Sequence, residues 1–140
     1  MKSKAVLTRT DVAHLLDAAR AEALACQWPV TIAVVDDGGH PLALERLDGC
    51  APASAYIAME KARSAALGRR ETKAYEDMIN GGRSAFLSAP VLSAMLEGGV
   101  PVLAGGQVVG AIGVSGVKPD QDAQVAKAGV AALDSLCEPA

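Results

Sequence analysis

Aromatic residues are scarce in this 140-residue chain, which has one Trp, two Tyr and one Phe. Hydrophobic residues nevertheless make up 51% of the sequence, so the core must be built from alanine and branched aliphatic side chains. A chain of this length can bury a substantial core, and we expect residues 1–140 to form a single domain. The same composition excludes an intrinsically disordered protein.

Cysteine pairs, basic clusters and long apolar runs are also missing from the sequence. Cys26, Cys50 and Cys137 lie far apart and form no CxxC pair, which argues against a disulfide framework and against a structural zinc site. The net charge of −3, without a basic cluster, argues against nucleic acids and acidic membranes as partners. There is no apolar run of ~18 residues and no signal-peptide core, so we expect a soluble, cytoplasmic protein.

Residues 31–46 predict a β-hairpin. Its apolar first strand is TIAVV, its turn is DDGG, and its second strand is HPLALER. Glycine adopts positive φ without steric cost, so we expect Gly38 or Gly39 to have this conformation. Further strands are predicted at residues 91–95, 100–103 and 107–114, the last two joined by a tight Gly-Gly turn. Tight hairpins require antiparallel neighbours, which indicates an α+β fold with an antiparallel sheet of about five strands and helices packed on it.

Three segments have helical periodicity, and Thr72 suits the cap of a further short helix. Thr8 and Asp11 resemble a capping box at the start of the first helix, which ends before Pro29. The second helix is expected from Ala53 or Ser54 to Leu67, and the last begins near Pro119. The side chains expected in the core are Val12, Leu15, Leu16, Ala19, Ala23 and Cys26, then Ala55, Ala58, Met59, Ala62 and Ala66, and finally Ala123, Ala126, Val130, Leu133 and Cys137. The residues expected to face away from the core on the second helix are Ile57, Lys61 and Ser64.

The first helix has a second face made almost entirely of small residues. His14, Ala18, Ala21 and Ala25 project together there, where a solvated helix normally carries Lys and Glu. A smooth, nearly uncharged face suggests contact with another subunit or with a flat ligand. We therefore expect a homo-oligomer.

Candidate polar residues surround the predicted hairpin. Asp36, Arg46, Asp48 and Lys61 could form one polar site at the sheet edge or two ordinary ion pairs, and the ion pairs are the default interpretation. The segment GAIGVSG lacks the spacing of a phosphate loop, and its glycines within a strand predict close backbone packing. Ser115 at its end lacks the GxSxG context of a hydrolase nucleophile.

The chain has two histidines, His14 and His40, and neither HxH nor HExxH occurs. This disfavours a metal site made of histidines from one chain. His40 follows the glycine turn, where a ligand could approach the backbone, but a hydrogen-bonded structural role is equally open. The neighbouring Asp36 favours the imidazolium form of His40, so His14 is the better candidate for a neutral imidazole ligand.

Four motifs in order resemble the GlcG/HbpS family, which includes the C-terminal domain of PduO-type proteins. The resemblance covers Thr8 to Leu136, and the motifs are VVDDGGHPLALERLDG, MEKARSAA, EGGVPV and GQVVGAIGVSG, the last followed by Asp120 and Asp122. It implies a profilin-like α+β fold, homo-oligomers up to octamers, and the haem binding known for characterised members.

Three functional hypotheses follow from these residues and this resemblance. The first is a small haem-binding or haem-handling protein with His14 on the iron and Arg46 or Lys61 paired with a propionate. The second is an isomerase or hydrolase acting on a small carboxylate-bearing metabolite, in which His40 or Asp36 moves a proton and Arg46 or Lys61 holds the carboxylate. The third is an accessory subunit without chemistry. The candidate ligand-contacting residues are His14, His40, Arg46, Asp48, Lys61 and Ser115.

Overall fold

The computed structural model describes residues 1–137, with side chains up to Asp134. The chain folds in the order α1 (Arg9–Ala25), β1 (Thr31–Asp36), β2 (Pro41–Arg46), α2 (Ala53–Gly68), α3 (Thr72–Asn80), the 3₁₀ helix η1 (Ser84–Ser88), β3 (Gly99–Ala104), β4 (Gln107–Ser115) and α4 (Pro119–Cys137). The predicted α+β class is therefore confirmed.

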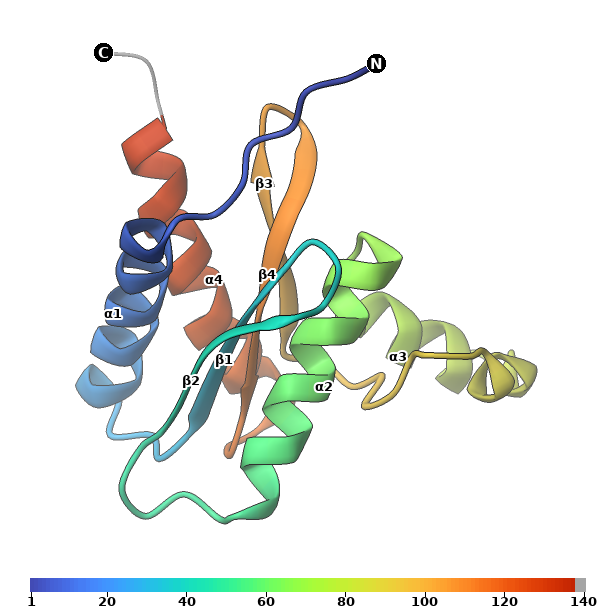
Figure 1. Ribbon diagram of the computed structural model, residues 1–140. Helices are drawn as coiled ribbons and strands as arrows, with labels where there is room; N and C mark the ends of the chain where they lie inside the picture. Colours follow the sequence, from blue (N-terminus) through green and yellow to red (C-terminus); the bar gives the residue numbers. More distant parts are fainter. Residues whose placement is uncertain (138–140) are drawn as a thin grey trace.

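The sheet lies between two helical layers. Its strand order is β2-β1-β4-β3, and every neighbouring pair is antiparallel. Helices α1 and α4 cover one face and α2 covers the other, while α3 and η1 extend beyond the sheet (Figure 1). The central strand β1 is buried along nearly its whole length because helices cover both of its faces.

The expectation of about five strands is wrong by one, because Val91–Met95 forms no strand. Val91 and Ala94 have φ angles of 61° and 45°, which an extended strand does not allow. The segment is held to α2 instead, since the Ser64 hydroxyl donates to the Ser93 carbonyl at 2.6 Å and accepts from the Ser93 amide at 3.0 Å. An apolar sequence such as VLSAM fits either a strand or a buried loop, and here tertiary hydrogen bonds select the loop.

Both predicted hairpins are present. Gly39 in the first turn has φ +79°, which confirms the expected positive φ, and the Asp36 carboxylate accepts hydrogen bonds from the amides of Gly38 and His40 at 3.0 and 2.9 Å. Gly105 and Gly106 in the second turn have φ +59° and +77°, the combination found in a type I′ turn. The short turns thus follow directly from their local sequence.

The two sheet faces differ in side-chain size. Ile32 and Val34 of β1, like Ile112 and Val114 of β4, belong to the core shared with α1 and α4. The opposite face is lined by small residues, and its core with α2 consists of Ala33, Val35, Ala58, Ala62, Ala65, Ala66 and Ala111. Side chains alternate along a strand, so Ile112 and Val114 of the segment GAIGVSG face α1 and α4, whereas Ala111 and Gly113 face α2. Helix α2 can therefore lie unusually close to the sheet.

The capping box and four of the six core residues predicted for the first helix are confirmed. Thr8 and Asp11 form the expected capping box, and Val12, Leu15, Ala19 and Ala23 are buried. Cys26 and Leu16 are half-buried. In α4, Ala123, Ala126 and Leu133 are buried and Val130 is half-buried, whereas the side chain of Cys137 lies outside the described residues. Thr72 does not cap α3, because its hydroxyl accepts from the Gly99 amide at 2.8 Å and donates to the Leu96 carbonyl, which ties α3 to the start of β3.

The predicted faces of α2 are partly wrong. Lys61 and Ser64 were expected to face away from the core, but both are buried, with 3% and 0% of their surface exposed. Ala55 and Met59, expected in the core, are half-buried. Helix α2 is composed largely of alanine and serine, which gives it little amphipathic contrast, so periodicity alone could not orient it.

Candidate functional site

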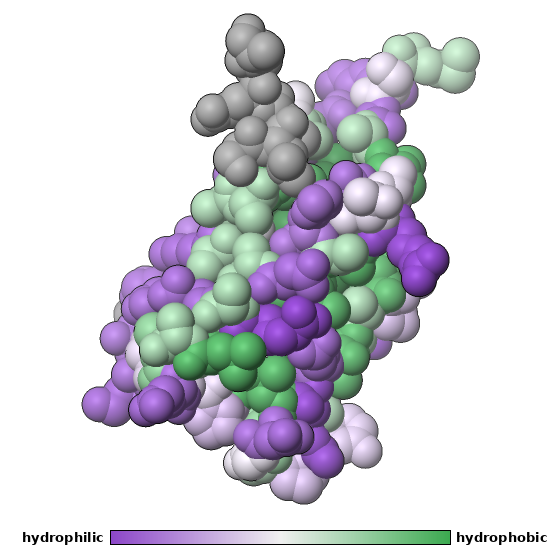
Figure 2. All heavy atoms as spheres, turned by 90° about the vertical axis from the view of Figure 1, so that its left-hand side faces the viewer, coloured by the Kyte–Doolittle hydropathy of each residue, from purple (hydrophilic) through white to green (hydrophobic). Residues whose placement is uncertain are grey.

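His14 lies on the outer face of α1. Leu15, Ala19 and Ala23 point into the core, and a helix repeat of 3.6 residues then turns His14, Ala21 and Ala25 to solvent, with Ala18 half-buried beside them. Figure 2 views the side of the molecule formed by α1 and α4 and shows apolar groups interspersed with hydrophilic ones. The expected small-residue face is therefore exposed within one chain.

The imidazole of His14 makes no hydrogen bond with any residue whose side chain is described. Asp11, three residues before His14 on α1, is engaged in the capping box, where hydrogen bonds from the backbone and side chain of Thr8 lower the pKa of that carboxyl. The carboxylate is thus occupied at the helix N-terminus. A ring nitrogen of His14 remains available to an external ligand, on a rigid helical platform.

His40 and Asp36 form an exposed pair in the first hairpin. The Nδ1 atom of His40 lies 3.0 Å from Oδ1 of Asp36, and 77% of the His40 side chain is exposed. The same Asp36 oxygen accepts the two turn amides described above, so this carboxylate already organises the backbone. Neither residue lines the four best-formed grooves given by the described residues.

Lys61 occupies a buried ion pair. Its ammonium lies 3.1 Å from Oδ2 of Asp122 and donates to the Val114 carbonyl at 3.0 Å. Asp122 also accepts from the Val117 amide at 3.1 Å, which anchors the first turn of α4. Burial raises the pKa of the Asp122 carboxyl above its usual range, partly opposed by the nearby Lys61 charge.

Three of the four motifs that carry the family resemblance meet at this ion pair. Lys61 belongs to MEKARSAA, Val114 to GAIGVSG, and Asp122 follows the last motif. Gly98 of EGGVPV lies so close that an added Cβ would be 2.8 Å from the Lys61 ammonium and 2.7 Å from the Val114 carbonyl. The pair therefore joins α2, β4, α4 and the turn before β3.

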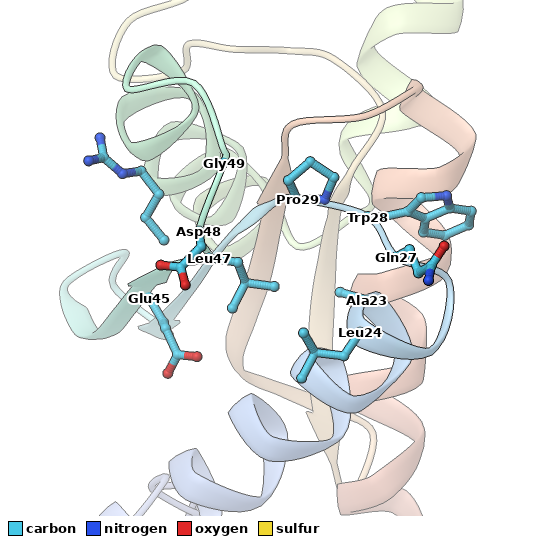
Figure 3. A pocket seen from close by; sticks show the side chains of 10 residues that line it. Ala23, Leu24, Gln27, Trp28, Pro29, Glu45, Leu47, Asp48 and Gly49 are labelled. Atoms are coloured by element: carbon cyan, nitrogen blue, oxygen red, sulfur yellow. The ribbon is translucent and has the colours of Figure 1, made fainter.

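The proposed sheet-edge site of Asp36, Arg46, Asp48 and Lys61 is divided by the structure. Lys61 is buried with Asp122 and Asp36 belongs to the hairpin turn, as described above. Only Arg46 and Asp48 remain together, and they line a groove of about 580 Å³ between the end of α1 and the end of β2 (Figure 3).

Ser115 lies at the end of β4 in a cluster of small polar side chains. It is buried, and its carbonyl lies 3.8 Å from the Cys50 thiol, which donates to it. Ser54 links the cluster, because its hydroxyl lies 2.8 Å from both the Cys50 thiol and the Thr31 hydroxyl. The polar groups of this cluster therefore find their hydrogen-bond partners within the core. No local motif in the sequence predicts this cluster.

Metal centres and membrane spans are two further classes of site. Among residues 1–134, whose side chains the structure describes, no group of three or more His, Cys, Asp or Glu side chains could hold a metal ion. Within residues 1–137, no helix has the length and apolarity needed to cross a bilayer.

Comparison with known proteins identifies the family. Residues 7–131 match the family described as "Haem degrading protein HbpS-like". The chain belongs to the HbpS-like family. It is 58% identical to Protein GlcG of Escherichia coli (strain K12) over 115 residues, which are 82% of this chain and 85% of GlcG.

Solved structures agree with the assignment to the HbpS-like family. A double mutant of Streptomyces reticuli HbpS matches with a TM-score of 0.83 and 32% identity, over 94% of this chain and 89% of that one. The structure of the PduOC:haem complex matches with a TM-score of 0.81 and 26% identity, over 91% of this chain and 95% of that one. The resemblance seen in the sequence motifs is thereby confirmed.

Proposed function

We propose that this HbpS-like chain binds haem, with His14 as the axial ligand of the iron. The carrying observation is an exposed imidazole without a hydrogen-bond partner among the described side chains, set on a helix among alanines. Small neighbours allow a flat macrocycle to approach the ring nitrogen, and neutral histidine is a usual haem ligand. The haem complex of the structural relative PduOC supports haem binding, while the choice of His14 depends on the geometry of α1.

One chain offers the haem a single surface. His14 is ten residues before Leu24 of the α1–β2 groove, about 15 Å along the helix axis, so the groove does not enclose a macrocycle centred on His14. A porphyrin on the α1 face keeps its second face in water unless another molecule covers it. We propose that a second copy of the chain supplies this cover, which makes the haem site intermolecular.

Substitution of His14 tests the ligand assignment. We expect His14→Ala to lose or shift the Soret band of the haemin complex, since the axial ligand sets the electronic environment of the iron. His40→Ala is the matched control and should preserve the spectrum, because His40 lies on the hairpin, bonded to Asp36. Haemin titration followed by absorbance provides the measurement. The reverse pattern would assign the iron to His40, and indifference to both substitutions would refute histidine ligation.

A charge introduced on the α1 face tests whether a second copy of the chain packs there. Ala21 is exposed and points away from the core, so Ala21→Glu should leave the fold intact while placing a carboxylate in the proposed contact. We expect the variant to dissociate to monomers in light scattering, with an unchanged far-UV circular dichroism spectrum. Lys73→Glu, on an exposed position of α3, is the control and should keep the assembly. A wild-type protein that is already monomeric at micromolar concentration would contradict the proposal.

The enzyme hypothesis has weaker support. His40 and Asp36 satisfy the geometry of an acid–base pair, but the Asp36 carboxylate is engaged by turn amides and His40 projects into solvent. General acid–base catalysis requires a substrate held beside the pair, and none of the four best-formed grooves of the described residues includes either residue. We therefore propose haem binding in preference to acid–base catalysis.

A further inference from the structure

The groove between α1 and β2 has a size and composition suited to a small ligand. Its volume of about 580 Å³ falls within the range of small-molecule sites. Leu24 is 60% exposed at the groove, although it is a large apolar side chain. In Figure 3, Leu24 and Leu47 point toward one another across the groove, with Ala23 behind Leu24. The groove therefore offers an apolar surface to a ligand.

The charges around the groove favour a cation. Asp48 lies on its β2 side and makes no hydrogen bond or ion pair with any residue whose side chain is described. Glu45 beside it is held by Arg20, whose guanidinium donates to the carboxylate at 2.8 Å. Arg20 must also neutralise Asp17, at 2.9 Å, so this one arginine is shared by two carboxylates. Asp48 is left as an open partner for a positive group.

The backbone adds to this negative potential. Helix α1 ends at the groove, and the negative end of its dipole is directed there. No basic residue stands in the last turn of α1 to compensate it. Among the ten groove residues Arg46 is the one positive side chain, and Glu45 and Asp48 are negative. Arg20 and Asp17, which adjoin Glu45, add one charge of each sign, so carboxylates outnumber cations three to two. The local balance is therefore acidic.

We infer that the groove binds a small organic cation, a protonated amine with an apolar body. The ammonium would pair with Asp48 near the end of α1, and the apolar body would lie against Leu24 and Leu47. This site is separate from the proposed haem face, which lies on a different side of α1.

Three probes with the same alkyl chain length test the inference. Hexylammonium, hexanoate and hexanol share one alkyl chain and differ in charge. Trp28 lines the groove and is the one Trp of the sequence, so its fluorescence reports binding directly. We expect hexylammonium to bind saturably and about five-fold more tightly than either of the other two probes. A single, partly exposed charge pair contributes a gain in affinity of about this size. Backbone amide shifts in NMR should localise to Gln27 and residues 45–49.

Substitution of Asp48 completes the test. Asp48→Asn should weaken hexylammonium binding about five-fold and remove the preference over hexanol. Asp77→Asn, an exposed carboxylate on α3, is the matched control and should leave both affinities unchanged. Asp48 is exposed, so its substitution is not expected to unfold the protein, and thermal denaturation verifies this. Equal or tighter binding of hexanoate, no saturable binding of the amine, or an amine affinity unaffected by Asp48→Asn would each overturn the inference.

Discussion

Lys61→Met is expected to lower the free energy of unfolding by about 3–5 kcal/mol, because it leaves the buried Asp122 carboxylate without its cation. Methionine retains the shape of the lysine stem, so packing changes little, and the substitution removes the charge together with the hydrogen bond to the Val114 carbonyl. Lys73→Met is the matched control, because Lys73 forms an exposed pair with Asp77 and should contribute less than about 0.5 kcal/mol. Urea denaturation at pH 7 provides both values.

The destabilisation should depend on pH in a defined direction. The folded-state pKa of Asp122 is already raised by burial, and losing Lys61 removes an interaction that lowers it. A carboxyl whose pKa is higher in the folded state binds its proton more tightly there, so its contribution to stability is present at low pH and lost as pH rises. The gap between wild type and Lys61→Met should therefore narrow as the pH falls from 7 toward 4.

A double variant separates charge from packing. Lys61→Met/Asp122→Asn removes both charges, while the oxygen of the introduced carboxamide can still accept a hydrogen bond from the Val117 amide. We expect it to be more stable than Lys61→Met at pH 7 and to lose the pH-dependent gap. If Lys61→Met were as stable as wild type, the ion pair would not be buried as described.

Gly113→Ala is expected to lower the free energy of unfolding by about 3 kcal/mol or more, although only one methyl group is added. An added Cβ would lie 2.5 Å from the Ala62 nitrogen and closer still to the Ala58 carbonyl, so it meets the backbone of α2. A flexible side chain could move aside, but a helix backbone cannot shift without opening the whole α2–sheet interface. Soluble expression and the urea midpoint provide the measurement.

Gly105→Ala is the control for this substitution. Gly105 has φ +59° and no atom within 4 Å of an added Cβ, so its replacement costs conformational energy alone, about 1 kcal/mol. Gly113 has no such positive φ, and its cost is steric. Equal effects of the two substitutions would show that α2 does not rest on β4 at this position.

Local chemistry was sufficient to predict the elements that depend on few residues. The Thr8–Asp11 capping box, the positive φ of Gly39 and the Gly105–Gly106 turn each follow from contacts within five residues, and each is present. The core stripe of α1 was also predictable, because its apolar residues repeat at the helical period. Close packing at GAIGVSG was inferred from its glycines, and Gly113 carries it.

The tertiary structure decided the roles of residues whose partners are distant in sequence. Lys61 and Asp122 are 61 residues apart, and α2 is so rich in small residues that its sequence does not reveal which side is buried. The same holds for residues 91–95, which tertiary hydrogen bonds with Ser64 hold as a loop. The sequence by itself determined the family, the α+β class and the turns, because these depend on local motifs and their order. Folding alone placed Lys61 in a buried ion pair and left Asp48 exposed at a groove. Charges become buried and distant residues become paired only when α2, β4 and α4 pack together.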